Sequence, residues 1–67
     1  MSAIIAPSPV SVLIVDDEAP ARARLRDLLA DLAAELPNEV VAEAENGVGA
    51  LEVIAALKVD VALVDIR

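Results

Sequence analysis

VLIVDDEAP, residues 12–20, sets a short apolar run directly against three acidic residues and a nearby proline. A continuous apolar run is typical of a parallel strand that is covered on both faces, because a solvent-facing side would require alternating polar residues. Pro20 suits the first turn of a helix, where its missing N–H has no partner to lose. The stretch therefore predicts a buried strand over residues 12–15, an acidic turn and a helix.

Leucines after Pro20 recur at three- and four-residue steps, which predicts a helix with one apolar face. The leucines of this stripe are Leu25, Leu28, Leu29, Leu32 and Leu36. Pro37 and Asn38 are expected to end the helix. The β-prone run over residues 39–43 then predicts a second strand.

The remaining residues repeat the order of helix and strand. Asn46 and Gly47 have turn chemistry, and Asn46 is the expected N-cap of a second helix that runs out near Lys58. Its apolar positions are Val48, Leu51, Ile54, Ala55 and Leu57. Residues 59–64 form a third apolar run, which ends on Asp65 as the first run ends on Asp16.

This alternation predicts two right-handed crossover units on a parallel sheet. The expected fold class is α/β with a doubly wound parallel sheet. If the first strand is central, with the second strand on one side and the third on the other, the strand order is 2-1-3 and it reverses between the first and third strands. In such sheets ligands bind outside the carboxyl ends of the strands, where the strand order reverses. Asp16, Asp17 and Asp65 stand at such ends, so they are expected to converge there.

Three carboxylates held close together repel one another unless a cation offsets their charge. Mg²⁺ is the expected cation, because it prefers oxygen ligands, keeps several waters and commonly takes one or two carboxylates together with a phosphate. The acidic turn therefore predicts half of a magnesium and phosphoryl site.

The composition narrows the classes of partner. The net charge of -7 argues against a nucleic acid or an anionic membrane as the direct partner and favours cations. The absence of Cys and His excludes a disulfide scaffold and a zinc domain, and it fits a cytoplasmic protein. Residues 1–9 lack the segments of a secretory signal and are expected to be a flexible leader.

Residues 10–67 resemble the N-terminal half of the receiver domains of bacterial two-component response regulators. The motifs that carry the resemblance are VLIVDDE, AENG before the second helix, and VALVDIR. The resemblance implies a flavodoxin-like fold, truncated to strand, helix, strand, helix and strand. It also implies a phosphoacceptor signalling domain and not an enzyme, which at most catalyses its own phosphorylation.

The resemblance further implies a role for each acidic residue. Asp65 would accept a phosphoryl group from a histidine kinase. Asp17 would bind Mg²⁺ directly, Asp16 mostly through a water, and Asp65 and the backbone carbonyl of Arg67 would be further ligands. A receiver also has a Ser or Thr on strand four and a Lys on strand five that contact the phosphoryl group. In receivers these two residues lie after the half that this sequence matches. Slow or absent phosphorylation of this chain is therefore expected.

The stretch DDEAPARARLRDLL and the ending DIR resemble the receiver subgroup whose output is a LytTR-type DNA-binding domain. The chain is therefore expected to reach DNA and transcription only through an output domain that lies outside this sequence.

Two other interpretations assign the chain to different functional classes. A strand that ends in DE also resembles the Walker B element of P-loop ATPases, but the sequence contains no GxxxxGK[ST] to cradle a triphosphate. The other reading is a non-signalling receiver fragment with an open third strand. Such a fragment would associate through that edge, either with itself or with a partner that supplies the missing half of the fold.

Arg22, Arg24 and Arg26 resemble a basic patch on the first helix. Acidic residues follow on the same helix, so a solvated face with local ion pairs is expected. Those acidic residues are Asp27, Asp31 and Glu35.

Overall fold

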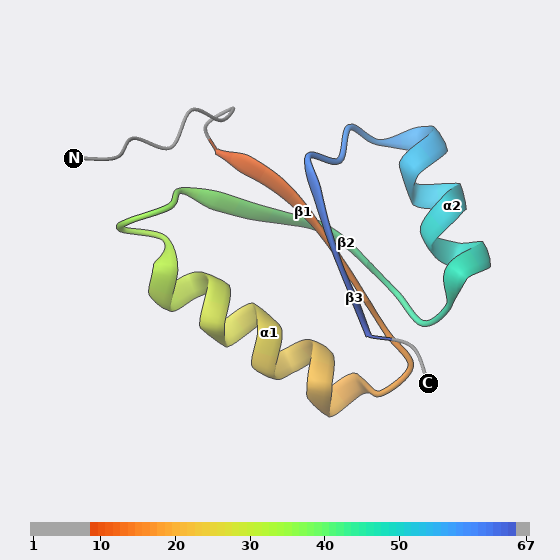
Figure 1. Cartoon of the computed structure of the whole chain (residues 1–67), viewed down its shortest axis with the longest axis horizontal. Coiled ribbons are helices and arrows are strands. Elements are labelled where there is room, and N and C mark those ends of the chain that lie inside the picture. Colours follow the sequence, from red (N-terminus) through yellow and green to blue (C-terminus); the bar gives the residue numbers. More distant parts are fainter. Residues whose placement is uncertain (1–8, 66–67) are drawn as a thin grey trace.

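The computed structural model describes residues 9–65, which form three parallel strands between two helices (Figure 1). The elements in chain order are β1 (Val10–Asp16), α1 (Ala19–Leu32), β2 (Asn38–Ala44), α2 (Gly47–Ala56) and β3 (Val61–Asp65). The strand order is β2-β1-β3, and both pairings are parallel. The predicted α/β doubly wound sheet with strand order 2-1-3 is therefore confirmed. Apart from Pro9, the leader expected over residues 1–9 lies outside the described residues.

The core is built around β1, whose side chains alternate between two apolar clusters. The cluster on the α1 side contains Val10, Val12, Ile14 and Leu29, and the cluster on the α2 side contains Leu13, Val15, Ala44 and Ala50. Successive strand residues point to opposite faces, so a strand covered on both sides must be apolar at every position. This is the physical reason for the unbroken apolar run before the acidic turn.

Side chains of two asparagines mark the ends of the helices. The Asn38 side-chain amide donates to the backbone oxygens of Leu29 (2.8 Å), in the last turn of α1, and of Leu36 (2.9 Å), in the segment that follows the helix. The Asn46 side chain accepts a hydrogen bond from the backbone N–H of Gly49 at 2.9 Å, which confirms the predicted N-cap of α2.

The predicted leucine stripe of α1 is only partly buried. Leu29 is buried and Leu25 is half-buried, whereas Leu28 and Leu32 are exposed. The prediction that Pro37 and Asn38 end this helix is wrong, because α1 ends at Leu32, and the half-buried Leu36 packs against the core from the turn that follows. In the described part of the chain, α1 packs mainly on β1 and β2, and β3 contributes Leu63 to the apolar cluster on that side. The surface beneath the helix therefore covers only part of the stripe.

A β-bulge in β2 changes the face on which its side chains lie. Val12 pairs with Val40, but the next residue, Leu13, pairs with Ala42, so Val41 is the extra residue. Beyond the bulge, Ala42 joins the cluster on the α2 side, and Glu43 pairs with Ile14, whose side chain lies on the α1 side. The bulge therefore brings a carboxylate beneath α1.

The start of β3 is fixed by Asp60. Its backbone N–H donates to the Ser11 carbonyl at 2.9 Å, and its carboxylate accepts from the Ser11 N–H at 2.8 Å. The regular strand begins one residue later, at Val61, whereas the sequence predicted a start at residue 59. Within residues 9–65, neither helix has both the length and the apolar character that a membrane span requires.

The two-sided burial of β1 predicts different costs for the same substitution at two positions. Ile14 is 0% exposed and Ile54 is 50% exposed. We expect Ile14→Val to lower the free energy of unfolding by about 0.5–1.5 kcal/mol, because it leaves a small cavity. Ile54→Val should change it by less than about 0.5 kcal/mol. Urea unfolding followed by circular dichroism measures both values, and equal losses would contradict the assignment of β1 as the core strand.

Candidate functional site

Two acidic residues lie side by side at the carboxyl ends of β1 and β3. Asp16 and Asp65 are register partners in the parallel pairing, two positions beyond the pair formed by Ile14 and Leu63. Both members of that apolar pair pack on the α1 side, so Asp16 and Asp65 also belong to that face. Neighbouring strands are about 4.8 Å apart, which brings the two carboxylates close together.

Asp16 is buried, with 4% of its surface exposed. Its carboxylate oxygen Oδ1 accepts a hydrogen bond from the Glu18 N–H at 2.9 Å, and its backbone carbonyl accepts one from Nη1 of Arg22 at 2.7 Å. A buried carboxylate is costly unless hydrogen bonds replace its water. Asp16 therefore shapes the turn between β1 and α1, a role that the sequence analysis did not assign to it.

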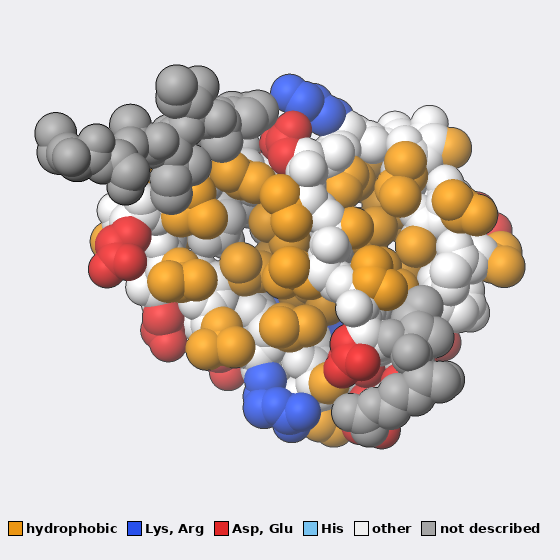
Figure 2. Space-filling view, in the orientation of Figure 1, with side chains coloured by type: hydrophobic (Ala, Val, Ile, Leu, Met, Phe, Trp, Pro, Cys, Tyr) orange, Lys and Arg blue, Asp and Glu red, His pale blue; other side chains and the backbone are white. Residues whose placement is uncertain are grey.

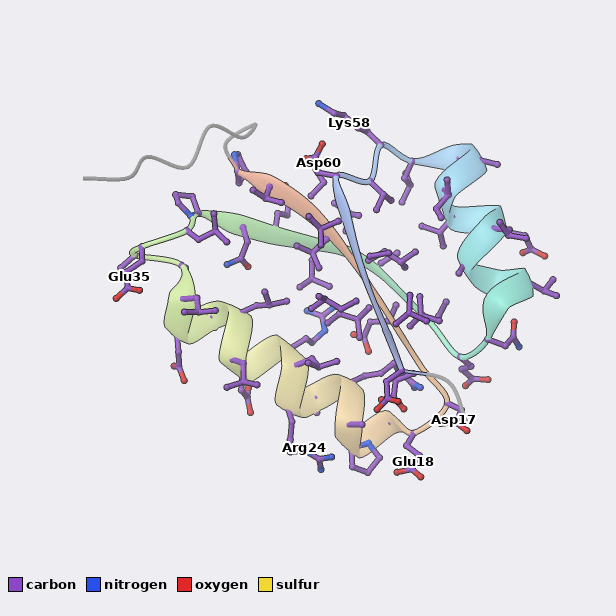
Figure 3. All side chains as sticks on the ribbon, in the orientation of Figure 1. Asp17, Glu18, Arg24, Glu35, Lys58 and Asp60 are labelled. Atoms are coloured by element: carbon purple, nitrogen blue, oxygen red, sulfur yellow. The ribbon has the colours of Figure 1, made fainter. Side chains whose placement is uncertain are left out.

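Asp17 and Asp65 are exposed, in contrast to Asp16. Figure 3 shows Asp17 and Glu18 in the turn after β1, at the end of the sheet opposite Lys58 and Asp60. Asp17 thus lies next to the paired carboxylates in the chain and at the same end of the sheet. The backbone carbonyl of Arg67, the fourth ligand implied by the resemblance, lies outside the described residues.

The structure joins Asp16 to Asp65 but does not gather three carboxylates into one cluster. No group of three or more acidic, His or Cys side chains within residues 9–65 is arranged so that it could hold a metal ion. The donors present are hard oxygen ligands, which suit Mg²⁺, and this ion commonly takes only one or two carboxylates and completes its shell with water. The chemistry of the Asp16 and Asp65 pair therefore fits Mg²⁺, although the expected convergence with Asp17 is not preformed.

A second charged cluster lies on the same face. Glu43 on β2 accepts a hydrogen bond from Nε of Arg22 at 3.1 Å and another from Nε of Arg26. The expectation of local pairs along α1 is wrong for these two arginines, because the bulge in β2 brings Glu43 beneath the helix. Arg24, between them in sequence, is exposed on the outer side of α1 (Figure 3).

The two arginines hold Glu43 in its ionised form. The hydrogen bond from Arg26 is the main cause that lowers the pKa of Glu43 below its ordinary value of 4.5. Desolvation acts in the opposite direction, while the charge of Arg26 and the hydrogen bond and charge of Arg22 lower the pKa further. Glu43 is therefore mostly ionised at pH 4.5, its ordinary pKa.

Sequence reasoning missed Arg22 and Glu43 as partners at this end of the molecule. The four-residue spacing of Arg22 and Arg26 does place them on one helix face. The position of Glu43, however, depends on a bulge that the sequence pattern does not reveal.

Comparison of the chain with protein-family models, with curated proteins and with solved structures gave no match. The function of the chain is therefore inferred from the geometry of this acidic end and from the sequence motifs.

The ion pairs of Glu43 predict a pH-dependent contribution to stability. The lowered pKa means that this contribution is complete above pH 4.5, the ordinary value, and is lost as the pH falls through the lower folded-state pKa. At pH 7, Glu43→Gln should therefore reduce the free energy of unfolding by about 0.2–1 kcal/mol, the range of pairs at the surface. Well below the folded-state pKa, the variant and the wild type should be equally stable.

Glu39→Gln is the matched control, because Glu39 is exposed on the same strand and has no ion pair in the described structure. Urea unfolding of the three proteins at neutral and acidic pH makes the comparison. A pH dependence that is the same for Glu39→Gln and Glu43→Gln would contradict the ion-pair network.

Proposed function

We propose that this chain is a phosphoacceptor module of the receiver type, in which Asp65 takes a phosphoryl group from a phosphohistidine of a histidine kinase. The observation that best supports the proposal is the side-by-side pairing of Asp16 and Asp65. The pair lies at the carboxyl ends of the central strand and its neighbour, where the strand order reverses. This is where open α/β sheets bind their ligands.

The difference in burial between Asp16 and Asp65 indicates a different role for each residue. Asp16 is enclosed and hydrogen-bonded at its carboxylate, so an incoming phosphohistidine has poor access to it. Asp65 is exposed, so its carboxylate is accessible to a partner protein. We therefore assign Asp65 as the acceptor and Asp16 as the fixed acid beside it.

The reaction is a direct displacement at phosphorus. A carboxylate oxygen of Asp65 forms the new bond to phosphorus while the bond between phosphorus and the histidine nitrogen breaks, and the electron pair of that bond leaves with the imidazole. The product is an acyl phosphate on Asp65 and a free histidine on the kinase.

The roles of Asp16 and Asp17 in the proposal are to hold a cation at this end of the sheet. Mg²⁺ bound by Asp16, Asp17 and Asp65 would offset the repulsion between the carboxylates and the phosphoryl oxygens, which is the electrostatic part of phosphoryl transfer. Because β1 is buried on both faces, Asp16 is carried on a rigid element.

The proposal also includes where the module acts and how it affects transcription. It acts in the cytoplasm together with its kinase. With a net charge of -7 the chain does not itself bind DNA, and it reaches transcription only through an output domain.

A second candidate function is association through β3, which the exposure of that strand favours. In the described structure β3 pairs with β1, and its half-buried Leu63 packs against the apolar cluster on the α1 side. Val61 is 41% exposed and Val64 is 61% exposed. Figure 2 shows this side of the molecule, where hydrophobic side chains gather along β3 and between α1 and α2. An edge strand with exposed apolar faces is a template for pairing with another chain.

Phosphoryl transfer predicts an adduct that depends on Asp65. Prolonged incubation of the whole chain with Mg²⁺ and a small acyl-phosphate donor should slowly add the mass of one phosphoryl group, detected by intact-mass spectrometry. Asp65→Asn should abolish the adduct because the nucleophilic carboxylate is gone. Asp16→Asn should reduce it strongly while it keeps an oxygen that can accept from the Glu18 N–H.

Asp31→Asn on the exposed side of α1 is the matched control and should label like the wild type. Hydroxylamine should remove the adduct, because it cleaves acyl phosphates and leaves phosphoserine intact. An adduct that persists in Asp65→Asn, or a wild-type chain that is not labelled, would refute the proposed function.

Association through β3 predicts that the chain elutes as a species larger than a monomer, as measured by light scattering after size-exclusion chromatography. Val64→Lys should shift it toward the monomer, because a charge on an edge strand opposes pairing. Leu51→Lys on α2 is the matched control, since Leu51 is 69% exposed and lies outside the sheet. A monomeric wild type would rule out this second function.

A further inference from the structure

Arg22 is the most enclosed of the three arginines on α1, and it lies at the acidic end of the sheet. Its side chain is 15% exposed, against 49% for Arg26. Arginine is rarely buried unless its guanidinium is paired. Here Nη1 donates to the carbonyl of Asp16 at 2.7 Å and Nε donates to Glu43 at 3.1 Å. One guanidinium thus connects the ends of β1 and β2.

The contacts of Arg22 close a small ring of hydrogen bonds around the acidic turn. The Arg22 side chain binds the Asp16 carbonyl, the Asp16 carboxylate accepts from the Glu18 N–H, and the Glu18 carbonyl accepts from the Arg22 backbone N–H at 3.1 Å. Asp16 is therefore held at its backbone and at its side chain. Loss of the Arg22 contact would free the peptide that carries both Asp16 and Asp17.

Glu43 completes the arrangement from the opposite side. It fixes the guanidinium of Arg22 through Nε, which leaves Nη1 directed at the Asp16 carbonyl. A planar guanidinium can make two such bonds in fixed directions, whereas the single ammonium group of lysine cannot reproduce this fork. The contribution of Arg22 is thus geometric as well as electrostatic.

We propose that Arg22 is a positioning residue that fixes the orientation of Asp16 for binding of a divalent cation at the acidic end of the sheet. The proposal rests on the proposed function for the identity of the ligand, a divalent cation with oxygen chemistry. It goes beyond that function because it assigns a role to a residue outside the acidic motif. Arg22 contacts neither the cation nor the phosphoryl group in this scheme and acts through Asp16.

Charge and geometry give opposite expectations, which makes the proposal testable. If Arg22 mattered only as a nearby positive charge, its removal would tighten cation binding, because like charges repel. If Arg22 positions Asp16, its removal weakens binding. Arg22→Lys separates the two effects, since it keeps the charge and loses the fork.

The experiment measures binding of Mn²⁺, an oxygen-seeking stand-in for Mg²⁺ with an electron paramagnetic resonance signal, to the whole chain. Arg22→Lys and Arg22→Gln should each raise the Kd about 10-fold, the lower end of the loss seen when a residue that orients a metal ligand is removed. Arg24→Lys and Arg24→Gln, at an exposed position on the same helix, should leave the Kd unchanged. Circular dichroism and urea unfolding check that every variant is folded.

An unchanged Kd for Arg22→Lys, together with a lower Kd for Arg22→Gln, would overturn the proposal in favour of charge alone. A wild-type chain that does not bind Mn²⁺ would refute the cation part of the proposed function, and the role of Arg22 would then be decided by hydrogen exchange. The Glu18 amide, which donates to Asp16, should exchange several-fold faster in Arg22→Lys than in Arg24→Lys. Equal exchange rates in the two variants would overturn the proposal.

Discussion

The structure depends on a single constraint, the burial of β1 on both faces. The chain has no aromatic residue, so the apolar clusters on the two sides of the sheet must be built from aliphatic side chains that meet on this one strand. The two crossover connections have the same hand but run in opposite directions across the sheet. They therefore place α1 and α2 on opposite faces, with β1 as the central strand. β3 also pairs with β1 but is less well covered, as its exposed residues Val61 and Val64 show.

The same strand explains why the acidic end is both ordered and accessible. β1 carries Asp16 as far as the edge of the core, where the carboxylate is still buried and takes the Glu18 N–H as a substitute for water. β3 is less well covered, with only Leu63 half-buried among its described residues, and Asp65, the register partner of Asp16, is exposed. Two acids that are equivalent in the sequence pattern thus acquire different environments, and this difference underlies our division of roles between them.

A one-residue irregularity in β2 connects the sheet to the acidic turn. Without the bulge at Val41, alternation from Val40 would direct Glu43 toward the α2 side, away from the arginines of α1. With the bulge, Glu43 meets Arg22 and Arg26, and Arg22 in turn binds the carbonyl of Asp16. A feature of strand register therefore controls which charges surround the candidate site.

The sequence by itself determined the order of the elements and the acidic strand ends. Apolar periodicity, Pro20 and the Asn46 cap are local signals, and they were sufficient to predict a parallel sheet. The central position of the first strand was a condition that the structure confirmed, and with it came the strand order 2-1-3 and the pairing that joins Asp16 to Asp65. Only the tertiary structure decided that Asp16 is buried while Asp65 is exposed, that the leucine stripe is half covered, and that Arg22 pairs with Glu43. These properties depend on which elements cover which face and on a shift of register, and they arise from contacts between residues far apart in the chain.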